Sequence, residues 1–189
     1  MRLNPQFVNR NSKLSPPLSD NILDQLLYPC VYVIDGYFLL QTAPLDMETN
    51  HFYPARKSLI EFLLQKIHDG LAEEILITSW ELHMGTACRG VNWDRHSLSD
   101  LRAAVSCIGG PCLASLCRHL AQDYRSWSRG MPDLLLWRFH GDYNDEAKLA
   151  EVKGPRDQLS EQQRACLLLL MDCGFNVEVC KVSPGRSSP

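Results

Sequence analysis

The sequence predicts an α/β fold, in which helices flank a small mixed β-sheet and fill the N-terminal half of the chain. Three observations predict it. Helical patterns dominate the chain up to about residue 127. Two short apolar runs, 133–139 and 147–153, are then joined by the turn-forming stretch HGDYND. A final helix and a final strand follow, and this order is typical of a mixed sheet covered by helices.

The helices of the first half follow from the spacing of apolar residues. Asp20 suits the N-cap of a first helix through NILDQLLY, and an extended piece, CVYVID, comes next. The clearest helix covers 54–70, where Gly70 ends an amphipathic stripe. Its apolar residues are Leu59, Ile60, Leu63, Leu64 and Ile67. Three further helices are predicted: 72–85, one from Ser97 or Ser99 to 108, and 111–127 after the Gly109–Gly110 break.

The second half carries the predicted sheet. The runs 133–139 and 147–153 are the first two strands, 160–173 is a helix, and 175–182 alternates as a final strand. Residues 1–19 are polar and contain three prolines, so we expect a loosely ordered lead-in. We expect 20–182 to form one folded unit and 183–189 to be a tail.

Composition sets the broad class. A chain of 189 residues is long enough for one domain with a core and short for two. Its 45% apolar and 22% charged residues are ordinary for a globular protein. The net charge of −3 argues against a protein that coats nucleic acid by bulk electrostatics. Any contact with phosphate must therefore be local.

The cysteines and the N-terminus bear on the compartment. None of the eight cysteines forms a CxxC pair, so the spacing of a zinc finger is absent. The first residues lack the apolar stretch of a signal peptide, so we expect reduced, intracellular thiols. No apolar run is long enough to span a bilayer, and we expect a soluble protein with no membrane partner.

Charged residues stand at the ends of the first two strands. Asp133 opens one, and Glu151 and Lys153 close the next. If these strands pair antiparallel, the start of the first lies near the end of the second. Glu151 and Lys153 then share one face, and we expect Val152 to point oppositely into apolar packing.

Two carboxylates brought together in this way repel each other unless a cation joins them. Mg²⁺ or Mn²⁺ prefers oxygen ligands, so Asp133, Glu151 and the backbone carbonyl of Val152 form a candidate metal site. Lys153 can hold or deprotonate a water and offset charge on a phosphate. This set suits phosphodiester hydrolysis. An ordinary surface ion pair on an unrelated fold is the alternative.

The same residues carry a resemblance. Pro132, Asp133, Glu151, Val152 and Lys153 spell the P-D…E-x-K signature of the restriction-endonuclease-like, PD-(D/E)XK nucleases. The flanking stretches AVSCIGGPCLASLCRHLAQDYRSWSRGMPDLLLW, LAEVKGPRDQLSEQQ and VEVCKV resemble the VRR-NUC nuclease domain of Fanconi-associated nucleases. The resemblance is dense from about Ser79 to Val182 and extends back to QTAPLDMETNHF.

The resemblance implies roles for individual residues. Asp133, Glu151 and the Val152 carbonyl match the family's metal ligands, and Lys153 matches its catalytic lysine. Gln41 resembles an upstream active-site glutamine, although a surface amide before a turn is the other interpretation. A further metal-binding glutamate of the family has no match here. Asp20 and Asp24 are the acidic candidates for that position.

Several polar residues are candidates for DNA contact. Arg118, Arg125 and Arg129 lie on or just after the helix that leads to Asp133, with Asp123 as the one acidic residue among them. They can grip a DNA backbone, or simply form a solvated helix face. Arg156, just after the second strand, is a better phosphate candidate by position. Gln163 matches a family glutamine near the active site, and with Ser160 it also fits a capping box.

The implied function is a nuclear DNA-repair nuclease that uses Mg²⁺ or Mn²⁺. It would cut branched DNA such as 5′ flaps and trim 5′ ends during interstrand-crosslink repair, alone or with DNA-repair proteins. The family's other domains are missing from these residues, so we expect a fragment, a short isoform or an incomplete gene model. The alternative is a catalytically weakened fold that binds DNA or a repair partner.

Overall fold

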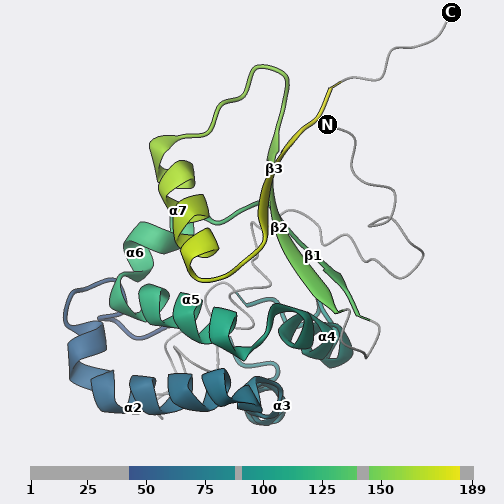
Figure 1. Cartoon of the computed structure of the whole chain (residues 1–189). Coiled ribbons are helices and arrows are strands. Elements are labelled where there is room, and N and C mark those ends of the chain that lie inside the picture. The colour runs from purple at the N-terminus through teal and green to yellow at the C-terminus, as the bar shows by residue number, and fades with distance from the viewer. Residues whose placement is uncertain (1–42, 88–90, 140–144, 184–189) are drawn as a thin grey trace, which may run out of the picture.

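The computed structural model describes residues 43–87, 91–139 and 145–183 (Figure 1). Its helices are α2 (Phe52–Lys66), α3 (Ala72–His83), α4 (Leu98–Ile108), α5 (Gly110–Gln122), α6 (Tyr124–Trp127) and α7 (Glu161–Asp172). Its strands are β1 (Leu134–Arg138), β2 (Glu146–Lys153) and β3 (Val177–Lys181). A π-helical segment, Ile67–Leu71, joins α2 to α3, and a 3-10 turn, Ser128–Gly130, follows α6. The helix expected after Asp20 and the extended piece CVYVID lie outside the described residues.

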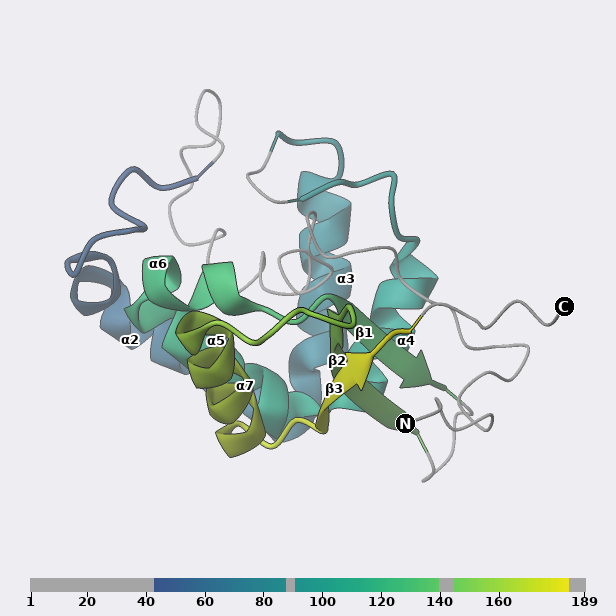
Figure 2. The same ribbon diagram turned by 90° about the horizontal axis from the view of Figure 1, so that it is seen from above.

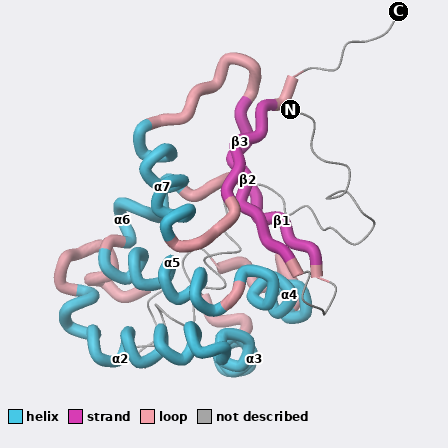
Figure 3. Tube along the Cα trace, viewed as in Figure 1, coloured by secondary structure: helices cyan, strands magenta, loops and turns pink. Residues whose placement is uncertain are grey.

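The sheet is mixed, as predicted, with the strand order β1-β2-β3 (Figure 3). β1 and β2 pair antiparallel, with Leu134 opposite Ala150. β2 and β3 pair parallel, with Leu149 opposite Val177. A parallel pair needs a crossover connection, and α7 supplies it between β2 and β3.

Odd-numbered residues of β1 and β2 face the hydrophobic core. Leu135, Trp137 and Leu149 are buried, and all three belong to one cluster with side chains of the helices. The largest helical contributions to that cluster are Phe52, Ile60, Leu64, Leu101, Leu116 and Leu120. Since directly paired residues share a face, the register also places Asp133 and Glu151 on the core side of the sheet.

Two glycines set the packing of α2, α3 and α5. Gly70, which was predicted to end a helix, has φ 98° and forms the kink between α2 and α3. A Cβ on Gly110 would clash with the carbonyl oxygen of Ile67, so α5 begins directly against the π-helical segment. This close approach lays α5 along α2, and the two helices lie side by side in both views (Figure 2).

Side-chain caps explain where α4 and α6 begin. The Ser97 side chain accepts the Asp100 N–H at 3.2 Å, so α4 is capped at Ser97 rather than Ser99. The predicted helix 111–127 is interrupted at Asp123, because α5 ends at Gln122 and α6 covers Tyr124–Trp127. Asp123 leaves helical geometry, and its carboxylate accepts the Ser126 N–H at 3.0 Å to start α6.

None of the described helices is both long and apolar enough to cross a membrane.

Candidate active site at the end of the sheet

The candidate site forms where β1 begins and β2 ends. Asp133 directly precedes β1, one position beyond the Leu134–Ala150 pair. Its Oδ2 atom accepts a hydrogen bond from the backbone N–H of Val152 at 2.7 Å. The predicted meeting of the two strand ends is therefore present, and it fixes one oxygen of Asp133 against β2.

Glu151 and Lys153 lie on the same face of β2, as predicted. The Lys153 Nζ is 2.9 Å from Oε1 of Glu151. The Glu151 side chain is 1% exposed and that of Lys153 is 12% exposed. An isolated buried carboxylate would be costly, and this ammonium offsets part of that cost.

Gln163, in the first turn of α7, reaches both of these groups. Its Nε2 donates to Oε1 of Glu151 at 2.5 Å, and its Oε1 accepts from the Lys153 Nζ at 3.0 Å. The same Oε1 accepts the Ser160 N–H at 3.0 Å, while Ser160 Oγ accepts the Gln163 N–H at 3.1 Å. The predicted capping box is confirmed. The Gln163 side chain also contacts both Glu151 and Lys153.

One oxygen of Glu151 has no hydrogen-bond partner within the part of the chain that the structure describes. Oε1 takes both bonds described above, whereas Oε2 is buried and accepts none. Buried polar atoms are almost always satisfied, so such an atom calls for an explanation. A divalent cation fits it, because carboxylate oxygens are the ligands that Mg²⁺ and Mn²⁺ prefer.

The Val152 carbonyl points toward the same edge. The Leu149 N–H donates to the Asn176 carbonyl, and the Lys153 carbonyl accepts from the Val182 N–H. The backbone N–H and C=O groups of these odd-numbered residues therefore point toward β3. The N–H and C=O of one strand residue point to the same side, and Val152 N–H points at Asp133. Its carbonyl therefore lies on the Asp133 side as well, consistent with the predicted backbone ligand.

The Val152 side chain points away from Glu151 and Lys153, as predicted, and is half-buried. It lies on the face opposite Leu135 and Leu149, and Ala150 on that same face is 1% exposed. The residues of the site instead occupy the core face, at the end of a row that includes Leu149. Alternation along the strand showed which side chains share a face, but not which of the two faces packs on the main hydrophobic cluster.

Among the described residues, no group of three or more His, Cys, Asp or Glu side chains converges in a way that could hold a metal ion. The candidate side-chain ligands at this end of the sheet are thus, among the described residues, the carboxylates of Asp133 and Glu151. Gln41, and both acidic candidates for a further ligand, Asp20 and Asp24, lie outside the described residues.

The arginines predicted to contact DNA differ in their surroundings. Arg118 is bound to Glu61 of α2 through Nε at 3.0 Å and Nη2 at 2.9 Å. Because this carboxylate already compensates its charge, the structure favours a role for Arg118 in joining two helices. Arg125, Arg129 and Arg156 are exposed and stay candidates for phosphate contact.

Two features of this region were not predicted. The first is the contact between Arg118 and Glu61, which no local sequence pattern indicates. The Tyr53 hydroxyl donates to Glu61 Oε1 at 2.6 Å. Cys166 lies three positions after Gln163 on α7 and is buried beside the site. Burial, and secondarily the charge of Glu151, raise the pKa of its thiol to about 11, so it stays neutral.

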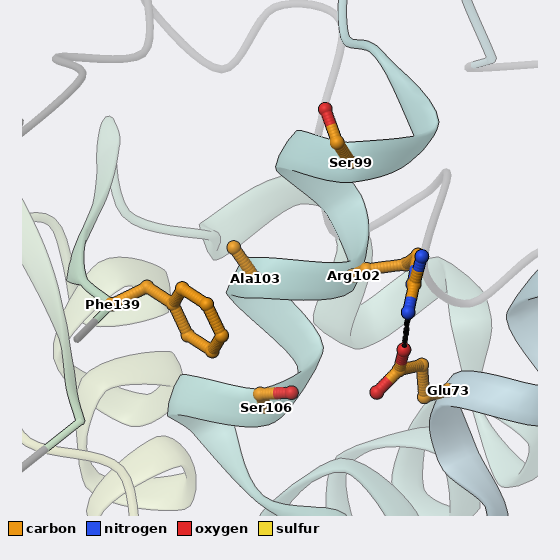
Figure 4. A pocket seen from close by; sticks show the side chains of 6 residues that line it. All are labelled: Glu73, Ser99, Arg102, Ala103, Ser106 and Phe139. Atoms are coloured by element: carbon orange, nitrogen blue, oxygen red, sulfur yellow. Dashed lines mark hydrogen bonds and ion pairs between the residues drawn. The ribbon is translucent and has the colours of Figure 1, made fainter. Parts of the chain in front are cut away.

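A cavity of about 360 Å³ lies elsewhere, between α3, α4 and the end of β1 (Figure 4). Its lining residues are Glu73, Ser99, Arg102, Ala103, Ser106 and Phe139. Arg102 and Glu73 form an ion pair at its rim. None of the residues at the end of β2 lines this cavity, so it is separate from the candidate site.

Comparison with protein families identifies the chain. The model of the VRR-NUC domain matches residues 67–184, which include α3 to α7 and the whole sheet. The chain belongs to the VRR-NUC family. The match covers Asp133, Glu151 and Lys153 together with Gln163.

Relatives with named functions agree with this membership. The VRR-NUC chain is 76% identical over 145 residues to a Fanconi-associated nuclease 1 homolog of Oryza sativa subsp. japonica. It is 41% identical over 146 residues to the Fanconi-associated nuclease 1 of Homo sapiens. These alignments cover 76% and 75% of this chain but only 15% and 14% of the relatives. The chain therefore spans about a seventh of the length of the relatives it matches.

Solved structures share the fold. A crystal structure of paFAN1 bound to DNA with a 2-nucleotide 5′ flap and a gap aligns with a TM-score of 0.75 at 22% identity. That alignment covers 94% of this chain and 33% of the other. The complex with a 1-nucleotide flap aligns with a TM-score of 0.76 at 20% identity, over 98% and 36% of the two chains. The predicted α/β fold is confirmed.

Proposed function

We propose that this VRR-NUC chain hydrolyses phosphodiester bonds of DNA with Mg²⁺ or Mn²⁺. Its substrates would be branched or 5′-ended DNA, cut as a 5′-flap endonuclease and a 5′ exonuclease, in the nuclear repair of interstrand crosslinks. The names of the relatives and the flap DNA bound in the paFAN1 crystals support this substrate. The observation that carries the proposal is the buried Oε2 of Glu151, which has no partner among the described residues and lies at the end of the sheet that carries Asp133 and Lys153.

Three oxygen groups of the chain would hold the ion. These are the Glu151 carboxylate, the Asp133 carboxylate, which retains lone pairs beyond its bond to Val152, and the Val152 carbonyl. When bound, a divalent ion supplies positive charge to phosphate oxygens and lowers the pKa of water. Asp133 and Glu151 come from different strands, so the β1–β2 register sets their relative position.

Lys153 would act on the phosphate and the attacking water. Its Nζ is held between Glu151 and Gln163, with the side chain 12% exposed, so the charge reaches the surface without moving freely. A fixed ammonium there stabilises negative charge that develops on a phosphate, and it can orient the water. Arg125, Arg129 and Arg156 would bind neighbouring phosphates of the DNA backbone. Gln41 is proposed to act in the same site.

The test is cleavage of a 5′-flap DNA labelled at either end, with and without Mn²⁺. We expect Glu151→Gln and Lys153→Met to lower the rate by about 100-fold or more. Lys181→Met is the matched control, because Lys181 pairs with Lys153 in the sheet and is exposed. It should stay within about threefold of the unmutated chain, as surface substitutions generally do. Equal product from the unmutated chain and Glu151→Gln would show that a contaminant cut the DNA.

The alternative function is binding of DNA or a repair partner by a catalytically weakened VRR-NUC fold. It is favoured by the two carboxylates that the described residues bring together, where a third acidic ligand would bind metal more tightly. Under this alternative, the unmutated chain would bind flap DNA in Mn²⁺ without cutting it. An anisotropy titration run beside the cleavage assay separates the two functions.

A further inference from the structure

We infer that Gln163 is a positioning residue of the VRR-NUC site, whose side-chain amide holds Glu151 and Lys153 in their working arrangement from α7. The inference rests on the proposed function, because the reaction it supports is the proposed hydrolysis. It replaces the prediction that Gln163 binds DNA. Its side chain is part-buried, and both ends of its amide already bond to protein groups.

The orientation of this amide is fixed by its neighbours. Oε1 faces two donors, the ammonium of Lys153 and the N–H of Ser160, and Nε2 faces the carboxylate of Glu151. A flipped amide would put its oxygen against a carboxylate and its NH₂ against two donors. Only one orientation therefore satisfies the site, and it requires a group with a donor at one end and an acceptor at the other.

This amide also determines which oxygen of Glu151 is left over. Oε1 is held from two directions, by Gln163 from α7 and by Lys153 from β2 itself. The two bonds to Oε1 restrain the carboxylate, and Oε2 is left without a partner among the described residues. Without Gln163, Lys153 alone would hold the carboxylate, and the two groups could turn together.

The support beneath Gln163 is rigid. The capping box with Ser160 fixes its place in the first turn of α7. Gln162, the next residue back, donates from Nε2 to the Ser126 carbonyl of α6. A Cβ on Gly130 would lie 2.8 Å from the Cβ of Cys166, so the turn that leads to Asp133 packs directly on α7. The helix that carries Gln163 is thus fastened to the segment that carries Asp133.

Three variants separate positioning from helix stability. Gln163→Met keeps the length of the side chain but removes both polar ends. Gln163→Glu keeps a capping box but cannot donate to Glu151. Ser160→Ala removes the acceptor for the Gln163 N–H and leaves the Gln163 side chain in place. Each variant is measured for Mn²⁺ affinity without DNA by calorimetry, for cleavage rate at saturating flap DNA, and for thermal midpoint.

We expect Gln163→Met to lose about 10- to 100-fold in Mn²⁺ affinity or in cleavage rate, the usual effect of removing a group that orients a metal ligand. Gln163→Glu should lose at least about tenfold in rate with its thermal midpoint preserved. Ser160→Ala should lower the midpoint and keep both other quantities within about threefold. The inference is overturned if Gln163→Met keeps both its Mn²⁺ affinity and its cleavage rate within about threefold of the unmutated chain. It is also overturned if Ser160→Ala loses as much affinity or rate as Gln163→Met.

A measurement without metal or DNA tests the positioning role of Gln163 independently of the proposed hydrolysis. In a ¹⁵N-labelled chain, the side-chain amide resonance of Gln163 should move in Glu151→Gln, and that of Gln162 should not. An unmoved Gln163 resonance overturns the positioning role. If it moves while the unmutated chain fails to cut DNA, the positioning role stands and the proposed function fails.

Discussion

Arg118 of α5 and Glu61 of α2 form a two-point ion pair that we expect to stabilise the fold. The guanidinium donates from Nε to Oε1 at 3.0 Å and from Nη2 to Oε2 at 2.9 Å. The Tyr53 hydroxyl adds a third bond to Oε1 at 2.6 Å. This arrangement joins two helices that are 57 positions apart in sequence at these residues.

The strength of the pair follows from its geometry and exposure. Exposed ion pairs contribute about 0.2–1 kcal/mol, and hydrogen bonds to charged groups about 1.5–3 kcal/mol. The Arg118 side chain is 39% exposed and that of Glu61 is 33% exposed, so solvent screens much of the attraction. The bidentate geometry raises the value toward the upper end of the surface range, and we expect a coupling energy of about 1 kcal/mol.

A double-mutant cycle measures this coupling. Arg118→Met, Glu61→Gln and the double variant are unfolded in urea beside the unmutated chain, and Arg125→Met serves as the control at an exposed position. Each single substitution in the pair should also lower the thermal midpoint by about 2–4 °C per kcal/mol lost. A coupling below about 0.3 kcal/mol would refute the reasoning, because the pair would then behave as two independent surface charges.

The same variants decide whether Arg118 binds DNA. We expect Arg118→Met to keep the affinity for flap DNA within about twofold, whereas a lost phosphate contact reduces the slope of log affinity against log salt by about 1. Arg125→Met, Arg129→Met and Arg156→Met should each show that smaller slope. An equal reduction for Arg118→Met would return it to the DNA-binding set and contradict the role in joining the helices.

Three further predictions follow from other contacts. The Arg118 guanidinium, with the Tyr53 hydroxyl, holds the pKa of Glu61 below its usual 4.5. The ionised Glu61 carboxylate therefore contributes its full stabilisation above pH 4.5, and this contribution is lost as the pH falls further. The stability difference between the unmutated chain and Glu61→Gln, measured in urea, should shrink over that acid range. Burial, then the charge of Asp145, raise the pKa of the Cys107 thiol from 9.0 to about 11, so its thiolate fraction at pH 8 should be about 100-fold lower than for an ordinary thiol. Alkylation of Cys107, followed by mass spectrometry, should therefore be slow at pH 8 and fast only near pH 11. Gly130→Ala should destabilise the fold by about 1–3 kcal/mol and slow cleavage, because the new Cβ would lie 2.8 Å from that of Cys166 and displace α7. Urea unfolding of Gly130→Ala and the unmutated chain, compared at the same m-value, would measure the loss of stability.

The arrangement of the candidate site was predictable because its residues obey three local rules. Hairpin pairing brings the start of one strand to the end of the next, and alternation puts Glu151 and Lys153 on one face. The S-x-x-Q spacing likewise placed Gln163 at the first turn of a helix. Each rule acts over a few residues, so the sequence is sufficient to apply it.

Contacts set by the packing of distant elements were beyond the sequence. The partner of Arg118 lies on another helix, and no spacing rule relates it to Glu61. The break at Asp123 depends on a side-chain cap that competes with an otherwise continuous helical pattern. Which face of β2 packs on the main hydrophobic cluster is likewise decided by the side that the helices cover, and the odd-numbered residue Leu149 belongs to that cluster.

The position of Glu151 shows why the charged end of β2 is better explained by function than by stability. It follows Leu149 in the core-facing row, is 1% exposed, and keeps one oxygen without a partner among the described residues. Replacing a buried ion pair by apolar side chains is often neutral or stabilising, so a leucine there would continue the core at lower cost. The sequence departs from the local pattern where Lys153 and Gln163 converge on the Glu151 carboxylate and Asp133 binds the backbone N–H of the next residue. Such departures are expected where a folded chain keeps an unfavourable group for its chemistry.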